Sequence, residues 1–367
     1  MLPLIISFYL FYFSLQSTVP YCLNPQGNEV DWYVIFLFPT SAASDNKLHY
    51  GYLDSNSYSE LEDYTYSEDS FPPTLITKFV TEGKSDRLNY FFWNDDRATK
   101  EESSSHGCPK TMAHAKGSLV YNEDSGAFLQ HSLPRFPTRT NENEMLTELP
   151  GNSGLYGQTF LCISVTKDTA NYITELLNYE YVSVNYGVKK DNVNSPPDKW
   201  VEKLIENSYD KSWDIDGTYY ISSIGGEKFT VHLRSYRVNY IPFDEPIRSF
   251  YQSSFYVRTW TRPASAESLC EKYKLLNVKE VKFLDYDYIS TKEHSKWAVA
   301  LKKDIVCFAD VNHTEAQKSR GGSIICFENE AISKIMRKAV VDNDTCDEIF
   351  RGNLRTVGEG RVVDLGD

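Results

Sequence analysis

The feature that most constrains how this chain can fold is a short motif that occurs twice, about half a chain apart. His114 and Lys116 stand two residues apart at the start of an apolar, β-prone run, and His294 and Lys296 open a second run of the same kind. Residues two apart in an extended strand point to the same face, so each motif would hold an imidazole beside an ammonium group. Two copies in matching context favour a duplicated domain whose halves bring both pairs to one place.

Such a pair of motifs suits a phosphoryl group. A neutral imidazole can attack phosphorus, a protonated imidazole can donate to a leaving oxygen, and a lysine can stabilise the non-bridging oxygens. Asp310 and Asn312 follow the second run, where a carboxylate could orient an imidazole and an amide could bind an oxygen. One histidine alone would more often be a half-buried residue at a strand edge, so the interpretation depends on the second copy.

Length, aromatic content and net charge limit the domain organisation of this chain and the way in which it could bind nucleic acid. At 367 residues the chain exceeds one typical domain, so two units that share an interface are expected. Aromatic residues make up 14% of the chain, which suits a β-rich interior. The net charge of −13 argues against passive electrostatic capture of nucleic acid at neutral pH, so binding to DNA would require a local basic groove or an acidic medium.

The N-terminus indicates entry into the secretory pathway. Residues 1–20 contain an uncharged apolar core followed by small and polar residues, which is typical of a signal peptide, with a buried strand or a signal anchor as the alternative. No later stretch has about 20 consecutive apolar residues, so we expect no transmembrane helix. Seven cysteines in a secreted chain imply disulfides and one remaining cysteine. The mature protein is therefore expected to be secreted or lysosomal.

Local patterns place the main elements. The dense β-type run from Val30 to Phe38 predicts a central strand of the first half, and helical spacing predicts helices at 168–179, 200–204, 264–276 and 331–340. Asn192 to Pro197, rich in Asn, Ser and Pro, is the best linker candidate. The predicted organisation is a signal peptide at 1–20, a first half at 21–197, a second half at 198–350 and a flexible tail at 351–367.

Several segments around the two motifs carry a family resemblance. They are Met112–Gly117, His131–Pro137, Gly157–Cys162, Ile221–Gly226, His294–Trp297, Asp310–Asn312 and Gln317–Gly322. Together they resemble the deoxyribonuclease II family, a branch of the phospholipase D superfamily with paired His-x-Lys motifs. The likeness runs from about Cys22 to Cys346, which is most of the chain.

The resemblance implies an α/β fold of the phospholipase D type, a pseudo-dimer of two β-sandwich halves flanked by helices, with the active site at their junction. It implies an acid endonuclease that hydrolyses DNA phosphodiester bonds to 3′-phosphate ends through a phosphohistidine intermediate, without metal or cofactor. By analogy with the superfamily, His114 would attack, and His294 would protonate the departing 5′-oxygen and then activate water. The catalytic residues implied are His114, Lys116, His294, Lys296, Asp310 and Asn312, with His131 and Asn122 as supporting residues.

One position departs from the family pattern. The first motif of the family has an acidic residue six positions after its lysine, and this chain has Asn122 there. Asn122 could still fix a histidine tautomer by accepting a hydrogen bond through its carbonyl, but it would stabilise an imidazolium less. The rivals that remain are a catalytically weakened secreted homologue that binds DNA or a host protein, another phosphodiesterase of the superfamily, and a purely structural β-rich secreted domain.

The resemblance also implies covalent features and partners. The disulfides would be Cys22–Cys162, Cys270–Cys346 and Cys307–Cys326, which leaves Cys108 as the odd cysteine. Asn343 lies in a sequon expected to be glycosylated, whereas the sequon at Asn312 should be silent because that amide belongs to the site. DNA is the expected partner, with a homodimer as a further option. No His or carboxylate cluster has metal-ligand spacing.

Overall fold

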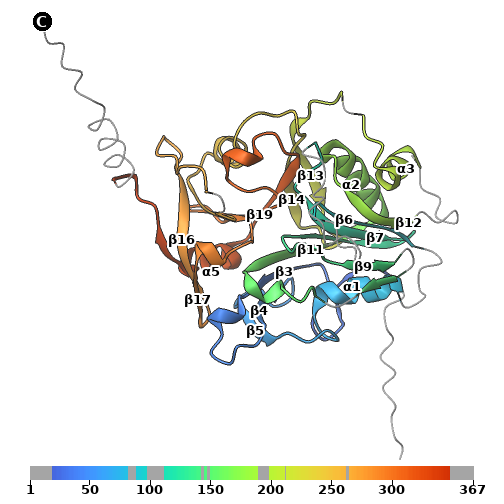
Figure 1. Ribbon diagram of the computed structural model, residues 1–367, viewed down its shortest axis with the longest axis horizontal. Helices are drawn as coiled ribbons and strands as arrows, with labels where there is room; N and C mark the ends of the chain where they lie inside the picture. Colours follow the sequence, from blue (N-terminus) through green and yellow to red (C-terminus); the bar gives the residue numbers. More distant parts are fainter. Residues whose placement is uncertain are drawn as a thin grey trace, which may run out of the picture.

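Two large β-sheets, one from each half of the chain, make up most of the computed structural model (Figure 1). It describes residues 19–81, 88–96, 111–141, 144–146, 149–188, 198–210, 212–261 and 264–347. The fold is mixed α/β, mostly sheet with few helices. The predicted signal peptide, the linker at 192–197, Cys108 and the tail at 351–367 lie outside the described residues, except for the last two positions of the signal peptide.

The first sheet has eight strands in the order β12-β6-β7-β8-β11-β3-β4-β5. Its strands are β3 (Trp32–Leu37), β4 (His49–Asp54), β5 (Glu62–Thr65), β6 (Asn89–Asn94), β7 (Lys116–Tyr121), β8 (Ser125–His131), β11 (Gln158–Thr166) and β12 (Val184–Val188). Two small pairs accompany it, formed by β1 (Cys22–Leu23) with β2 (Glu29–Val30) and by β9 (Thr138–Asn141) with β10 (Glu144–Leu146).

The second sheet has nine strands, eight of them in the order β13-β14-β20-β19-β18-β15-β16-β17, with the ninth, β21, paired to β16. Its strands are β13 (Asp216–Ser222), β14 (Lys228–Arg234), β15 (Phe255–Arg258), β16 (Leu275–Phe283), β17 (Tyr286–Ile289), β18 (Trp297–Ala300), β19 (Ile305–Ala309), β20 (Gly322–Glu328) and β21 (Val340–Asn343). The helices are α1 (Pro72–Thr81), α2 (Lys167–Glu180), α3 (Asp198–Glu206), α4 (Pro246–Tyr251) and α5 (Glu330–Ala339).

Five strands of the first sheet correspond to five strands of the second, because both sets have the same order across the sheet and the same order along the chain. The series β6-β7-β8-β11-β3 in the first sheet corresponds to β15-β18-β19-β20-β14 in the second. The strand after each His-x-Lys motif, β7 or β18, is the second member of its series, and a helix follows the fourth, α2 after β11 and α5 after β20. The two motifs therefore occupy matching places in the two sheets.

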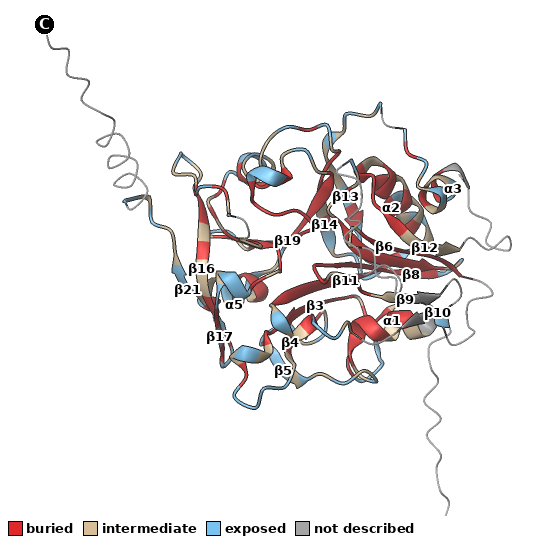
Figure 2. Cartoon of the chain, in the orientation of Figure 1, coloured by how far each residue is buried: buried red, intermediate tan, exposed pale blue. Residues whose placement is uncertain are grey.

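Alternation along the strands explains how the sheets pack. On β3, Val34 and Phe36 belong to the core between the sheets, whereas Ile35 and Leu37 belong to a second core on the outer face of the first sheet. This period of two is what an extended chain buried on both faces requires. The shared core includes a stacked pair, Phe36 and Phe283, whose ring centroids are 4.5 Å apart. Figure 2 shows the buried strands at the centre of the molecule, with exposed residues on the outer elements.

Helices α2, α3 and α5 form where the sequence predicts helices, whereas α1 and α4 were not predicted. α2 begins at the cap Thr166, whose side chain accepts a hydrogen bond from the backbone of Thr169, and it buries Ile173, Leu176 and Leu177. α3 packs against α2 and β12 of the first sheet. None of the helices within the described residues has the length and apolar character needed to cross a membrane.

The helix predicted at 264–276 was wrong. The described part of that segment is irregular up to β16, and Leu269 and Leu275 exchange two backbone hydrogen bonds of 2.8 and 3.0 Å. Cys270 is tied to Cys346, and Ala266 donates its backbone N–H to His313. These long-range constraints outweigh the apolar spacing that suggested a helix.

All three disulfides implied by the resemblance are present. They join Cys22 to Cys162, Cys270 to Cys346 and Cys307 to Cys326. The first fixes the N-terminal pair of strands to β11, and the third links the neighbouring strands β19 and β20. Each closes a loop and so reduces the entropy of the unfolded chain.

Candidate active site

His114 precedes β7 and is held by the second half of the chain. Its backbone N–H donates to the carbonyl of Gly321 at 2.9 Å. Its ring Nδ1 lies 2.7 Å from the carbonyl oxygen of Asp310, directly after β19. Both partners belong to the second half, so the position of the first histidine depends on the two halves being packed together.

His294 precedes β18 and is held in the same way by the first half. Its backbone N–H donates to the carbonyl of Gly157 at 2.8 Å, and its ring Nδ1 lies 2.9 Å from the carbonyl oxygen of Ser132. Ser132 directly follows β8, as Asp310 directly follows β19. Gly157 directly precedes β11, as Gly321 directly precedes β20. The two halves therefore orient one another's histidines through matched backbone groups.

These contacts determine the ring protons. A backbone carbonyl can only accept, so Nδ1 must carry the hydrogen in both His114 and His294. In the neutral imidazole, Nε2 then carries a lone pair. Each ring can thus act as a nucleophile or base at Nε2, and as an acid there once it is protonated.

The two lysines lie beside the histidines and are buried. Lys116 forms an ion pair with Asp95. Lys296 donates to the backbone carbonyl of His294 at 2.7 Å, and its ammonium nitrogen lies 3.4 Å from Nδ1 of that ring. Burial, together with repulsion from Lys116, holds the pKa of Lys296 well below its usual range. A bound anion would stabilise the charged form of Lys296, which is the property expected of a phosphate site.

Asp95 is a site residue that the sequence prediction missed. It follows β6, pairs with Lys116, lies 3.2 Å from the guanidinium of Arg320 and has a carboxylate oxygen 3.7 Å from Nε2 of His114. Burial alone would raise the pKa of Asp95, but Lys116, His114 and Arg320 outweigh it and hold that pKa well below its usual range. The available signal was an acidic residue two positions after the β-type run 88–93, but nothing in the sequence places that run beside the first motif.

Burial controls the protonation of both histidines. It lowers the pKa of His114 to about 3, even though Asp95 acts to raise it. It also lowers the pKa of His294 well below its usual range, and Lys296, Lys116 and His114 act in the same direction. Both rings are therefore neutral without an anion in the site. A phosphate placed between them would favour protonation of one imidazole.

Asp310 belongs to a buried polar cluster beneath the first motif. Its carboxylate accepts from Gln130 at 2.9 Å and from Ser323 at 3.0 Å, and it approaches the backbone N–H of Lys116 at 3.5 Å. Burial raises the pKa of Asp310 to about 6, although these groups act to lower it. Glu180, at the end of α2, is buried next to this cluster, and burial and Asp310 raise its pKa. The two carboxyl groups therefore favour sharing a proton in acid.

Two other predicted site residues, Asn312 and His131, are both buried. Asn312 is buried two residues beyond Asp310, and its side-chain oxygen has no hydrogen-bond partner among the described residues. His131 ends β8, and its ring stacks on Phe160 with centroids 5.5 Å apart. Burial, with Lys116 and Lys296, lowers the pKa of His131 to about 3, so this ring is neutral.

Asn122 lies at the opposite end of β7 from Lys116. Its side-chain oxygen accepts the backbone N–H groups of Asp124 and Ser125 at 2.9 and 3.0 Å, within the turn that joins β7 to β8. A strand rises about 3.3 Å per residue, so this turn is roughly 20 Å from the lysine. The structure does not bring Asn122 together with the other candidates.

Two aromatic residues lie beside His294. The ring centroid of Trp260, just after β15, is 5.0 Å from that of His294 and 4.9 Å from that of Tyr156. Gln158 is also close, with its side-chain oxygen 3.3 Å from Nδ1 of His294. His294 thus has an indole ring, an uncharged amide and the ammonium group of Lys296 as neighbours.

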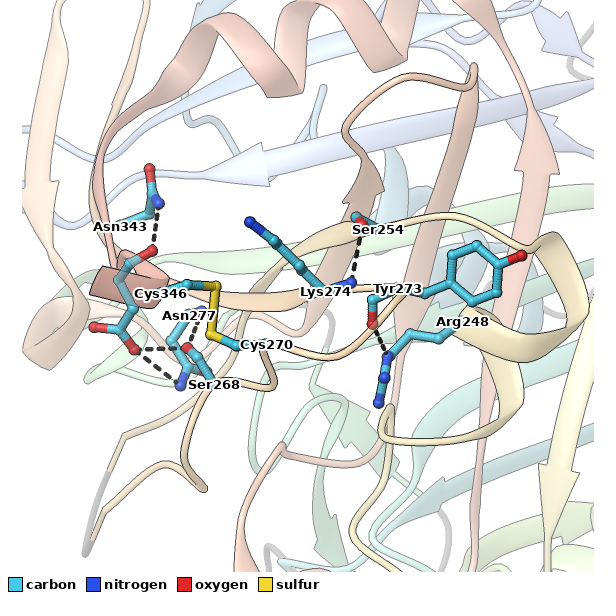
Figure 3. Close-up of a disulfide and its surroundings, with 10 residues drawn as sticks. Arg248, Ser254, Ser268, Cys270, Tyr273, Lys274, Asn277, Asn343 and Cys346 are labelled. Atoms are coloured by element: carbon cyan, nitrogen blue, oxygen red, sulfur yellow. Dashed lines mark hydrogen bonds between the residues drawn. A yellow bond between two sulfur atoms is a disulfide. The ribbon is translucent and has the colours of Figure 1, made fainter. Parts of the chain in front are cut away.

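No group of three or more His, Cys, Asp or Glu side chains in the described ranges is arranged to hold a metal ion. Asn343, the predicted glycosylation site, lies on β21, and its side-chain amide donates to the carbonyl of Asp344 at 2.7 Å (Figure 3). Figure 3 also shows that this end of the chain is anchored by the disulfide between Cys270 and Cys346. Glycosylation of Asn343 stays a prediction.

Comparison with known proteins gives one consistent result. Residues 21–346 match the family model described as Deoxyribonuclease II. Plancitoxin-1 of Acanthaster planci is 26% identical over 339 residues, which is 89% of this chain and 92% of the relative. Deoxyribonuclease-2-alpha of Rattus norvegicus is 26% identical over 87% of this chain and 92% of its own. Deoxyribonuclease-2-beta of Mus musculus is 27% identical over 89% of this chain and 92% of its own. Among solved structures, a polyphosphate kinase from Porphyromonas gingivalis aligns with a TM-score of 0.28 and 9% identity over 67% of this chain and 34% of its own, which supports no argument.

Proposed function

Because this chain belongs to the deoxyribonuclease II family and is a nuclease, we propose that it is an endonuclease that hydrolyses DNA phosphodiester bonds to 3′-phosphate ends without a metal ion. The fold that goes with this proposal is a pseudo-dimer of the phospholipase D type, with the active site where the two sheets meet. Its halves would be residues 21–197 and 198–350, after removal of a signal peptide.

The reciprocal orientation of His114 and His294 is the observation that carries the proposal. The backbone N–H and the ring Nδ1 of each histidine are bonded to carbonyl oxygens of the opposite half, so Nε2 is the ring nitrogen left for chemistry. Two imidazoles that face one phosphate can divide the work of a nucleophile and a proton donor. A single histidine could not perform both tasks in the same step.

The proposed reaction has two steps. In the first, one imidazole attacks phosphorus, and the other protonates the departing 5′-oxygen. In the second, the proton donor, now neutral, activates water, which displaces the first imidazole and leaves a 3′-phosphate. Lys116, Lys296 and the amide of Asn312 would bind the non-bridging oxygens, and Asp310 would hold the first motif through its backbone.

Several features make acid the natural medium for this chemistry. One imidazole must carry a proton, and both have pKa values lowered by burial. The net charge of −13 also weakens as carboxylates protonate, which reduces repulsion of DNA. The family and the disulfides are consistent with a secreted or lysosomal protein. We propose a destination of that kind, with DNA as the substrate and a homodimer as a further arrangement.

Histidine substitution tests this function. His114→Ala and His294→Ala should each reduce plasmid nicking at pH 5 in chelator by at least about 10²-fold, because each step uses both imidazoles. Circular dichroism and thermal melting should show folded protein in both variants. Substantial nicking by either folded variant would remove the two-histidine mechanism.

A further inference from the structure

The two halves differ at one matched position beside their histidines. In the first sheet, Asn94 pairs with Lys116, so the next residue, Asp95, lies opposite the middle of the motif. In the second sheet, Arg258 pairs with Trp297, one residue past Lys296. The residue that corresponds to Asp95 by register is therefore Trp260. One half has a carboxylate where the other has an indole.

This difference gives only one of the two imidazoles a carboxylate neighbour. Nε2 of His114 faces the carboxylate of Asp95 at 3.7 Å, which favours protonation of that ring, whereas Lys116, Lys296 and Arg320 act against it. His294 instead has the ring of Trp260 at 5.0 Å. Lys296 and Lys116 disfavour protonation of His294, and His114 would do so if it were charged.

We infer that this asymmetry assigns the two roles, with His294 as the nucleophile and His114, held beside Asp95, as the proton donor. The inference rests on the proposed function and reverses the assignment expected from superfamily analogy. A carboxylate that faces Nε2 stabilises the imidazolium and repels an approaching phosphate from that nitrogen. His294 has the indole of Trp260 at the matched position instead of a carboxylate, so nothing there competes with phosphate for its Nε2 lone pair.

Atoms and charge balance in each step. A bond forms between Nε2 of His294 and phosphorus while the bond from phosphorus to O5′ breaks, and His114 transfers its Nε2 proton to O5′. Water then attacks phosphorus, gives a proton to His114 and displaces His294, which leaves a 3′-phosphate. Asp95 neither gains nor loses a proton, so it is a positioning residue that acts through His114.

A substrate with a better leaving group separates the two roles. In thymidine 3′-(4-nitrophenyl phosphate), 4-nitrophenolate takes the place of O5′ and departs without a proton. His114→Asn should lower DNA cleavage by about 10²–10⁴-fold but keep a burst of 4-nitrophenolate within about tenfold of the wild-type rate. Its second step lacks a base, so mass spectrometry after alkaline denaturation should find the nucleotide on His294. His294→Asn should give no burst.

Asp95→Asn tests the positioning residue. DNA cleavage should fall by roughly 10- to 100-fold, and the alkaline limb of the pH profile should move to lower pH because His114 holds its proton less tightly. The burst with the nitrophenyl ester should change by less than about threefold, since that step needs no proton. Asp96→Asn is the matched control, because Asp96 pairs with Arg135 at the surface and should leave both activities intact.

These experiments distinguish failure of the role assignment from failure of the proposed function. A nucleotide trapped on His114, or a burst in His294→Asn but not in His114→Asn, would overturn the assignment while the proposed function stands. Equal losses on both substrates in Asp95→Asn would show that Asp95 serves the fold alone and would remove its proposed role. Failure of the wild-type protein to cut DNA in chelator at pH 5 would instead overturn the proposed function itself.

Discussion

Asn122 stabilises a turn instead of a catalytic group. Because its oxygen caps the turn between β7 and β8, Asn122→Asp keeps the acceptor and should leave DNA cleavage within about twofold of the wild-type rate. Asn122→Ala removes the acceptor and should cost about 1 kcal/mol of stability in urea denaturation. A tenfold gain of activity in Asn122→Asp would mean that the family's acidic position acts on the site and that this chain is a weakened enzyme.

Sequence and structure agree unevenly at the residue scale. The histidines and lysines of the two motifs could be found because a period of two places them on one strand face, and the structure brings them together. Asp95 could not, since 18 residues separate it from His114 and only the pairing of β6 with β7 joins them. The carbonyls of Ser132 and Asp310 were equally hidden, because backbone groups carry no sequence signature.

The strand β15 is fixed to the segment before β18 by a fully buried ion pair. Arg258 lies 3.2 Å from Glu293, the residue before His294, and both side chains are completely inaccessible to solvent. Glu293→Gln would leave the guanidinium buried without a counter-charge and should cost about 3–5 kcal/mol in urea denaturation. Glu330→Gln, at the exposed pair with Lys334, is the control and should change stability little. A loss in Glu293→Gln no larger than in this control would refute the structural role.

Elements show where sequence patterns suffice and where they fail. Strand β3 was predictable from its dense run of β-type residues, and helices α2 and α5 were predictable from their apolar spacing, to which the structure adds capping residues. The segment at 264–276 was not, because the disulfide from Cys270 and bonds to distant loops decide its path. Long-range constraints of this kind leave no local pattern.

The carboxyl pair at the end of α2 should make stability depend on pH. Burial raises the folded-state pKa of Asp310 from 3.8 to about 6 and raises that of Glu180 as well. The folded state then holds protons that the unfolded chain has released, so these groups favour folding in acid, and that advantage is lost as pH rises from about 4 through about 6. His114 and His131 act oppositely, since their pKa values are lowered to about 3 and they destabilise the fold as pH falls below about 6.5.

Glu180→Gln measures this effect. Between pH 5 and pH 7.5 the melting temperature of the variant should fall by a few degrees less than that of the wild-type protein. The reason is that a neutral amide replaces a buried carboxyl group that must ionise as the pH rises. Differential scanning calorimetry at the two pH values provides the comparison. An unchanged difference between them would show that Glu180 does not titrate in this range.

At the scale of the whole molecule, the site exists only because two sheets pack together. A shared core joins them, and each half supplies the backbone groups that hold the other half's histidine. The duplication was predictable from the repeated motif, but the crosswise hydrogen bonds depend on how the sheets meet. Under the proposed function, protonation of carboxylates in acid would reduce the negative charge that opposes the approach of DNA.

Plasmid nicking by the wild-type protein in chelator, followed from pH 4 to pH 8.5, tests the central claim most directly. Paired imidazoles with a shared proton predict a rate that is highest near pH 5, falls steadily above neutrality and is unaffected by added magnesium, with 3′-phosphate ends on the products. A rate that peaks at pH 7.5 or above, or cleavage that is absent in chelator and restored by magnesium, would contradict the account.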